Sequence, residues 1–355
     1  MTVRTRADLS ALPSYVPGKT IPGAIKLASN EVSAGPLPSV VRAIADAATA
    51  VNRYPDTAAT DLVARLGDKL GIPTGQLAVG CGSVTLCQQL VQATCTEADE
   101  VVFAWRSFEA YPIISAVVGA GQTRVPLTGG HGLDLAAMAA AITPKTRLVF
   151  VCNPNNPTGT ALRRQEIERF IEQVPAETLV VIDEAYKEFV DDPDVPDGVE
   201  LAKAQWAAGR DNVAVLRTFS KAYGLAGLRV GYAVGSPELA ETLRKVYVPF
   251  SVNALAQAAA MASLDAEDEL MARCRAIVAE RGRVRGELLA AGYEVPVSQA
   301  NFVWLPLGGR TAEFNEHCLA HKVVVRAFVG DGARVTIGEP EENDAFLAAA
   351  RSFRP

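Results

Sequence analysis

Short apolar runs alternate with helix-like segments through the middle of the sequence, and this alternation limits the folds that the chain can adopt. The apolar runs are rich in β-branched residues, which is typical of strands buried in a parallel sheet. They cover residues 77–79, 100–104, 123–125, 148–152, 179–182, 213–217 and 230–234. Helical periodicity begins at Ser83, Glu109, Leu133 and Arg163. The alternation predicts an α/β fold with a mostly parallel, seven-stranded sheet between layers of helices.

The character of the chain changes at Asn253, where a long Ala-rich and charged helical stretch begins. Because this stretch is too long for one globular helix, we expect it to break near Asp265. Strand-like runs follow at residues 301–307, 322–328 and 333–338. A final helical segment then closes the chain. The pattern predicts a large domain over residues 31–252 and a smaller α+β domain over residues 253–355.

The charge balance excludes some classes of partner. Lysine and arginine number 34 against 40 aspartate and glutamate residues, which gives a net charge of −6, and no dense basic stretch occurs. We therefore expect neither nucleic acid nor an anionic membrane as a partner. No run of about 18 uncharged apolar residues is present, and the amino end lacks the pattern of a secretory signal. These features predict a soluble cytoplasmic protein.

The cysteines and histidines give no sign of a disulfide framework or a metal centre. The six cysteines form no Cys-x-x-Cys pair in a chain of 355 residues, so we expect reduced thiols. His317, Cys318 and His321 could share one helical face, but the stretch lacks the acidic residue of a metalloprotease helix. We interpret it as a surface helix and expect no metal site.

Polar groups follow several predicted strands, at the sheet edge where α/β proteins bind ligands. Gly80-Cys81-Gly82-Ser83 leads from a strand into a helix, and the turn is either a phosphate cradle or a tight structural connection. After residues 148–152, two prolines and a glycine make a stiff loop that can hold Asn156 in place. Asp183 follows four apolar residues, so it is either a buried carboxylate that needs a cationic partner or a helix N-cap.

A lysine, Lys221, stands where the apolar run 213–217 ends. Thr218 and Ser220 provide hydroxyls before it, and Arg229 follows among glycines. Arginine binds phosphate bidentately, and the two hydroxyls can donate to the same oxygens. The stretch therefore predicts a phosphate-binding corner next to a lysine amine.

Pyridoxal 5′-phosphate meets the chemical demands of these residues together. Its phosphate would be held by Ser83 and Val84 at the helix start, with Thr218, Ser220 and Arg229. Lys221 would hold its aldehyde as a Schiff base and later act as the base at the substrate carbon.

The cofactor ring would be held by a second group of residues. Asp183 would keep the ring nitrogen protonated, so that the ring can accept an electron pair. Asn156 and Tyr186 would donate hydrogen bonds to the phenolic oxygen. Phe108 would stack on the ring, or it belongs to the core.

Four motifs carry a resemblance to a known family. They are Asn156-Pro157-Thr158-Gly159, Asp183-Glu184-Ala185-Tyr186, the run from Ser220 to Arg229, and Arg334-Val335-Thr336-Ile337-Gly338. With them the sequence resembles the fold-type I pyridoxal-phosphate aminotransferases, in the branch of the histidinol-phosphate and aromatic aminotransferases. The resemblance implies the fold of that family, with a large domain, a small domain and an N-terminal arm over residues 1–30.

The resemblance also implies site residues beyond the cofactor. Arg334 would hold the substrate carboxylate, or the phosphate of histidinol phosphate, with Arg326 near it. Tyr15 and Asn30 would lie in the segment that covers the substrate pocket. Tyr54 would reach the cofactor phosphate of the neighbouring subunit, so a homodimer is expected.

The sequence departs from the histidinol-phosphate pattern at two places. Those enzymes commonly read Asn-Glu-Asn-Pro-Tyr-Gly-Pro where this chain has residues 30–36, and they have an acidic pair where Val84 and Thr85 stand. A less polar lining suits an aromatic ring. We therefore expect a ping-pong transfer between an aromatic amino acid (phenylalanine, tyrosine or tryptophan) and 2-oxoglutarate, with histidinol phosphate as the alternative substrate.

Other functional classes share this scaffold. A pyridoxal-binding regulator would need a DNA-binding domain, for which we expect no room before Tyr15. A lyase would release pyruvate or ammonia without an acceptor. A dinucleotide-dependent dehydrogenase would need a third glycine in register, where Leu86 stands.

Overall fold

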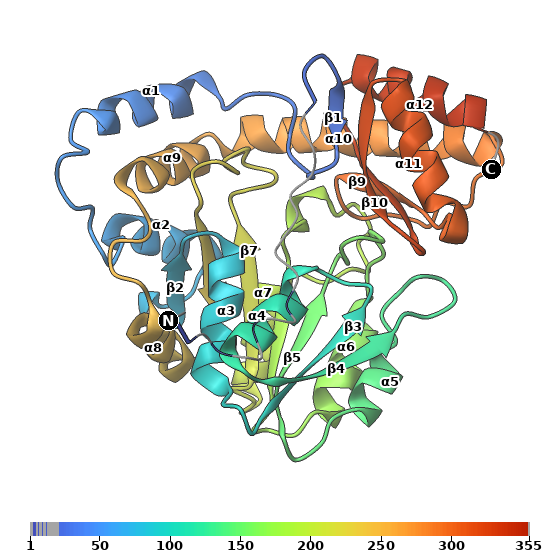
Figure 1. The fold of residues 1–355 in the computed structure, drawn as a ribbon. Helices are drawn as coiled ribbons and strands as arrows, with labels where there is room; N and C mark the ends of the chain where they lie inside the picture. Colours follow the sequence, from blue (N-terminus) through green and yellow to red (C-terminus); the bar gives the residue numbers. More distant parts are fainter. Residues whose placement is uncertain (1–2, 5, 7–8, 10–11, 13–20, 354–355) are drawn as a thin grey trace.

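Seven strands form the central sheet of the chain, in the order β2-β8-β7-β6-β5-β3-β4 (Figure 1). This computed structural model describes residues 3–4, 6, 9, 12 and 21–353. The strands are β2 (Leu77–Gly80), β3 (Glu100–Trp105), β4 (Gly121–Pro126), β5 (Thr146–Cys152), β6 (Leu179–Asp183), β7 (Val213–Thr218) and β8 (Gly231–Val234). Strand β8 runs antiparallel to β2 and β7, between which it lies, and the other six strands run parallel to one another. The prediction of a mostly parallel seven-stranded sheet is confirmed.

Both faces of this sheet are buried, because alternate residues of each strand point to opposite sides. Val149 and Val151 belong to one apolar cluster, whereas Leu148 and Phe150 belong to another. Helices α2 (Thr60–Leu70), α5 (Leu135–Ala140), α6 (Arg164–Gln173), α7 (Gly198–Ala207) and α9 (Ala254–Asp265) cover the first cluster. Helices α3 (Ser83–Thr94), α4 (Ala110–Val118) and α8 (Pro237–Val246) cover the second. The result is a three-layer α/β unit.

A second sheet of four strands has the order β1-β10-β11-β9. Its strands are β1 (Ile25–Leu27), β9 (Phe302–Leu305), β10 (Val323–Phe328) and β11 (Gly332–Thr336). Strand β1 pairs in parallel with β10, so the N-terminal segment joins the C-terminal part of the chain. Helices α10 (Glu267–Ala290), α11 (Thr311–Ala320) and α12 (Pro340–Phe353) share an apolar cluster with this sheet. This is the expected α+β unit.

The long helical stretch breaks where the sequence predicts. Asn253 is the N-cap residue of α9, and its side chain accepts a hydrogen bond from the Ala256 N–H at 2.9 Å. It ends at Asp265, and Ala266 lies outside the helical region, at φ −102° and ψ 25°, before α10 continues. Figure 1 shows α10 running from α9 towards the second sheet.

Helix α1 (Pro38–Ala48) packs against α9, and residues 21–353 also contain three short 3₁₀ segments. These segments are η2 (Thr74–Gln76), η3 (Lys187–Phe189) and η4 (Gly308–Arg310). The domain boundaries at residues 30/31 and 252/253 stay predictions. Among the described residues, no helix combines the length and the apolar character needed to cross a membrane.

Candidate active site

A cavity of about 230 Å³ lies at the carboxyl ends of β5, β6 and β7. Most of the residues that the sequence singles out line it. They are Asn30, Ser83, Val84, Phe108, Asn156, Asp183, Tyr186, Thr218, Ser220, Lys221, Arg229, Arg326 and Arg334. Residues separated by up to about 300 positions in sequence thus meet at one sheet edge, as expected for an α/β fold.

One predicted residue that the structure describes, Tyr54, does not line this cavity. Tyr54 is 82% exposed, and its ring stacks on that of Phe250 with centroids 4.6 Å apart. Tyr15 lies outside the described residues.

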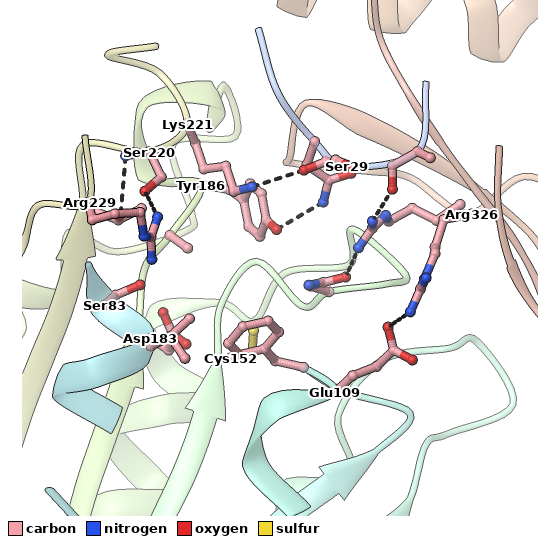
Figure 2. A pocket seen from close by; sticks show the side chains of 18 residues that line it. Ser29, Ser83, Glu109, Cys152, Asp183, Tyr186, Ser220, Lys221, Arg229 and Arg326 are labelled. Atoms are coloured by element: carbon pink, nitrogen blue, oxygen red, sulfur yellow. Dashed lines mark hydrogen bonds and ion pairs between the residues drawn. The ribbon is translucent and has the colours of Figure 1, made fainter. Parts of the chain in front are cut away.

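One corner of the cavity is built for an anion. Gly82 precedes α3 at φ 78° and ψ 160°, a backbone conformation that is essentially restricted to glycine. A Cβ atom at this position would clash with the guanidinium of Arg229. Arg229 Nη1 donates to Ser220 Oγ at 3.1 Å, which brings a cation, a hydroxyl and the N–H groups of a helix start together (Figure 2).

The carboxylate of Asp183 lies at the end of β6 with only 3% of the residue exposed. Its Oδ2 accepts a hydrogen bond from the Tyr111 hydroxyl at 2.7 Å, while Oδ1 has no hydrogen-bond partner among the described residues. Burial raises the pKa of this carboxyl to about 6. No helix begins at Asp183, so the alternative of an N-cap is wrong. An orphaned buried carboxylate oxygen fits a cationic N–H donor such as a protonated ring nitrogen.

Lys221 stands just past β7, where the sequence predicts it. Its Nζ donates to the backbone carbonyl of Ser29 at 3.1 Å (Figure 2). Burial lowers the pKa of this amine to about 7, and the positive charges of Arg334 and Arg229 act in the same direction. A large share of Lys221 is therefore neutral near pH 7, as a nucleophilic amine requires.

Tyr186 is a second polar group on the cavity wall. Asn30 Nδ2 donates to its hydroxyl oxygen at 2.9 Å. Asn30 itself is held by Thr336, whose Oγ1 lies 3.2 Å from Asn30 Oδ1 and accepts from its backbone N–H at 2.9 Å. Burial raises the pKa of the Tyr186 hydroxyl, so the group keeps its proton and can donate it in a hydrogen bond.

Two arginines come from the second sheet. Arg326 on β10 and Arg334 on β11 are directly opposite in the antiparallel register. Arg334 Nη1 donates to Asn156 Oδ1 at 2.5 Å, and its Nη2 donates to the carbonyl of Ala28 at 2.8 Å. Arg326 Nη2 forms an ion pair with Glu109 Oε2 at 2.7 Å. Both cations therefore face the cavity from the side opposite the central sheet.

A buried ion pair lies behind the strand ends. Arg217 donates to Glu184 from both Nε, at 2.9 Å, and Nη2, at 2.7 Å. Its Nη2 also donates to Asp197, the residue that caps α7, at 2.8 Å. Arg217 and Glu184 neighbour Thr218 and Asp183, so this pair fixes the ends of β7 and β6 relative to each other.

Three groups at the site are not singled out by the sequence. Tyr111 holds Asp183, Glu109 pairs with Arg326, and the Ser29 carbonyl accepts from Lys221. Glu109 directly precedes α4 and Tyr111 lies in its first turn, where the sequence shows only helical periodicity. A carbonyl acceptor has no signature in sequence, because every residue has one.

All residues that line the cavity lie in the part of the sequence that matches known proteins. Residues 22–349 match the family described as aminotransferase class I and II. An aromatic amino acid aminotransferase of Rhodococcus jostii is 61% identical over 352 residues, which cover 99% of this chain and 96% of that protein. One of Nocardia farcinica is 57% identical over 353 residues, with 99% and 97% covered.

The fold is likewise found among solved structures. The histidinol-phosphate aminotransferase of Sinorhizobium meliloti, solved in complex with pyridoxal-5′-phosphate, superimposes with a TM-score of 0.88 at 28% identity. The match covers 99% of each chain. The arrangement of the two sheets around the cavity is therefore shared with a structure that contains this cofactor.

Proposed function

Since the chain belongs to the class I and II aminotransferases, we propose that it transfers the amino group of an aromatic amino acid to 2-oxoglutarate. Pyridoxal 5′-phosphate is the proposed cofactor, and the two substrates react in turn by a ping-pong scheme. The observation that carries this proposal is the meeting of three groups in one cavity. They are the Lys221 amine, the orphaned Asp183 oxygen and the Ser220–Arg229 anion corner.

The residues of the cavity fit the cofactor from end to end. Ser83, Thr218, Ser220 and Arg229 would hold its phosphate, and Asp183 Oδ1 would receive the ring N–H. When bound, the cofactor supplies an aldehyde that takes up the amino group and a ring that stabilises the electron pair released at the substrate carbon.

The side chains of the protein supply proton transfer and orientation. Lys221, with a pKa of about 7, can accept a proton at the substrate carbon and return it nearby. Tyr186 keeps its proton and can donate a hydrogen bond to a phenolic oxygen. The Arg334 guanidinium, held by Asn156 and the Ala28 carbonyl, can hold the substrate carboxylate by two parallel hydrogen bonds.

Aromatic amino acids are the proposed donors because two lines of support agree. Relatives that share 57% and 61% identity carry the name aromatic amino acid aminotransferase. The chain also places Val84 and Phe108, both apolar, on the cavity wall. Histidinol phosphate is the second candidate, favoured by the two arginines at the cavity and by the fold of the Sinorhizobium meliloti enzyme.

A homodimer is part of the proposal. Tyr54 is exposed and does not line the cavity of its own chain. An exposed tyrosine stacked on Phe250 is suited to reach into the cavity of a second subunit. Chemical cross-linking of the purified protein, followed by measurement of the mass of the cross-linked product, tests whether it forms a dimer.

The experiment that tests the function follows the cofactor spectrum. Purified protein loaded with pyridoxal 5′-phosphate is mixed with phenylalanine, tyrosine, tryptophan or histidinol phosphate, one donor at a time and without acceptor. We expect the aromatic donors to convert the bound cofactor to its amino form, and 2-oxoglutarate to restore it. Conversion by histidinol phosphate alone would replace the aromatic assignment.

A further inference from the structure

Two arginines on neighbouring strands bring positive charge to the end of the cavity next to the second sheet. Arg326 and Arg334 are register partners on β10 and β11, and both line the cavity. Their guanidinium carbons lie 5.7 Å and 5.8 Å from the ring centre of the same residue, Phe328. Each guanidinium adds one positive charge at this end, and such charges attract a phosphate dianion more strongly than a single carboxylate.

Glu109 supplies a counter-charge from the other sheet. It precedes α4 and lines the cavity directly after Phe108. Its Oε2 lies 2.7 Å from Arg326 Nη2, and the side chains of Arg326 and Glu109 are only 16% and 30% exposed. Figure 2 shows Glu109 reaching from the large-domain side towards Arg326. An ion pair that is mostly shielded from water is screened less than a surface pair.

We propose that Glu109 sets the charge preference at this end of the cavity: by pairing with Arg326 it lowers the local positive charge by one, and so favours a carboxylate group over a phosphate dianion there. An aromatic amino acid brings one carboxylate, which Arg334 can hold without disturbing the Arg326–Glu109 pair. A phosphate monoester brings up to two negative charges near Glu109. Arg326 is already paired with Glu109, and the Glu109 carboxylate repels the phosphate. This inference rests on the proposed function and deepens it.

A purely structural role for Glu109 must be separated from this role in selection. The pair joins the start of α4, in the three-layer α/β unit, to β10 in the α+β unit. A structural role would be to hold these two units together. The chain offers a matched control in Arg106 and Asp331, an ion pair of 2.5 Å that also joins the two units. Neither of these residues lines the cavity.

The test compares two ligands that share a ring and differ in the anion. Holoenzyme is titrated calorimetrically with 3-phenylpropanoate and with 2-phenylethyl phosphate, neither of which has an amino group to transfer. In Glu109→Gln we expect the ratio of Kd for the phosphate to Kd for the carboxylate to fall about 10-fold. The Arg106 guanidinium also lies 5.7 Å from the Phe328 ring centre, so the control is the double variant Arg106→Gln/Asp331→Asn, which removes this link without changing the net charge. Its ratio should stay within about 2-fold of wild type.

A second variant moves the charge in the opposite direction. Arg326→Gln removes one positive charge and leaves the Glu109 carboxylate without this cation, so the ratio should rise. It also keeps the inference testable if Glu109→Gln does not fold. An unchanged ratio in both cavity variants, or equal changes for the two anions, would overturn the role of Glu109.

The failure of this inference differs from failure of the proposed function. If wild-type holoenzyme does not convert any aromatic donor, the proposed function is wrong whatever the ratio does. If it converts phenylalanine but Glu109→Gln keeps the wild-type ratio, only the role of Glu109 is wrong.

Discussion

Replacement of Gly82 by alanine tests the anion corner directly. The new Cβ atom would occupy the space of the Arg229 guanidinium, which donates to Ser220 Oγ and to the Ala226 carbonyl. Arginine is flexible, so the guanidinium would move away rather than break the fold. The cofactor phosphate would then lose the arginine.

The expected loss of affinity follows from that lost interaction. A hydrogen bond to a charged group contributes about 1.5–3 kcal/mol, which corresponds to a Kd for pyridoxal 5′-phosphate that is roughly 10- to 150-fold higher. The backbone adds a separate cost, because φ 78° and ψ 160° are unfavourable for alanine by about 1–3 kcal/mol. This second cost lowers the free energy of unfolding and does not act on the cofactor.

A matched variant separates the two effects. Gly209 follows α7 at φ +79°, and a Cβ atom there would meet no atom within 4 Å. Gly209→Ala should lower the thermal midpoint of unfolding but leave the cofactor Kd within about 3-fold of wild type. Cofactor-free protein is titrated with pyridoxal 5′-phosphate and followed by absorbance. A folded Gly82→Ala that binds as tightly as Gly209→Ala would refute the assignment of this corner to the phosphate.

Two further predictions concern Asp183 and Lys221. Asp183→Asn should keep the fold, since Tyr111 can still donate to the amide oxygen. An amide cannot compensate the charge of a ring cation, and we expect a loss of about 3 kcal/mol. The half-reaction, followed by stopped-flow absorbance, should therefore be at least ~100-fold slower. Near-normal turnover would remove Asp183 from the ring nitrogen. Because the pKa of Lys221 is lowered to about 7, the neutral amine is scarce below that pH and predominant above it. The rate at which cofactor-free protein takes up pyridoxal 5′-phosphate should therefore rise with pH through about 7 and then level off. A rise that continues towards pH 10 would indicate a lysine with an ordinary pKa.

Residues that follow directly on buried strands could be predicted from the sequence. Asp183 and Lys221 stand where apolar runs end, and parallel strands bring such ends to one edge of the sheet. The break after Asp265 was likewise predictable, because a globular helix is seldom so long. In each case a local pattern and a general rule of topology were enough.

Contacts between segments that lie far apart in the sequence could not be predicted in this way. Strand β1 has only three residues and pairs with β10 from the far end of the chain, so no local pattern marks it. The partners of Arg326 and Asp183 come from α4, and their positions depend on how that helix packs. Glu109 and Tyr111 therefore became visible as site residues only in three dimensions.

Tracking the amino nitrogen itself tests the central claim. Wild-type holoenzyme is supplied with ¹⁵N-phenylalanine and 2-oxoglutarate, and the products are identified by mass spectrometry. We predict one ¹⁵N-glutamate for each phenylpyruvate formed, and neither product with Lys221→Ala. Labelled ammonia in place of labelled glutamate, or unchanged transfer by Lys221→Ala, would contradict the account.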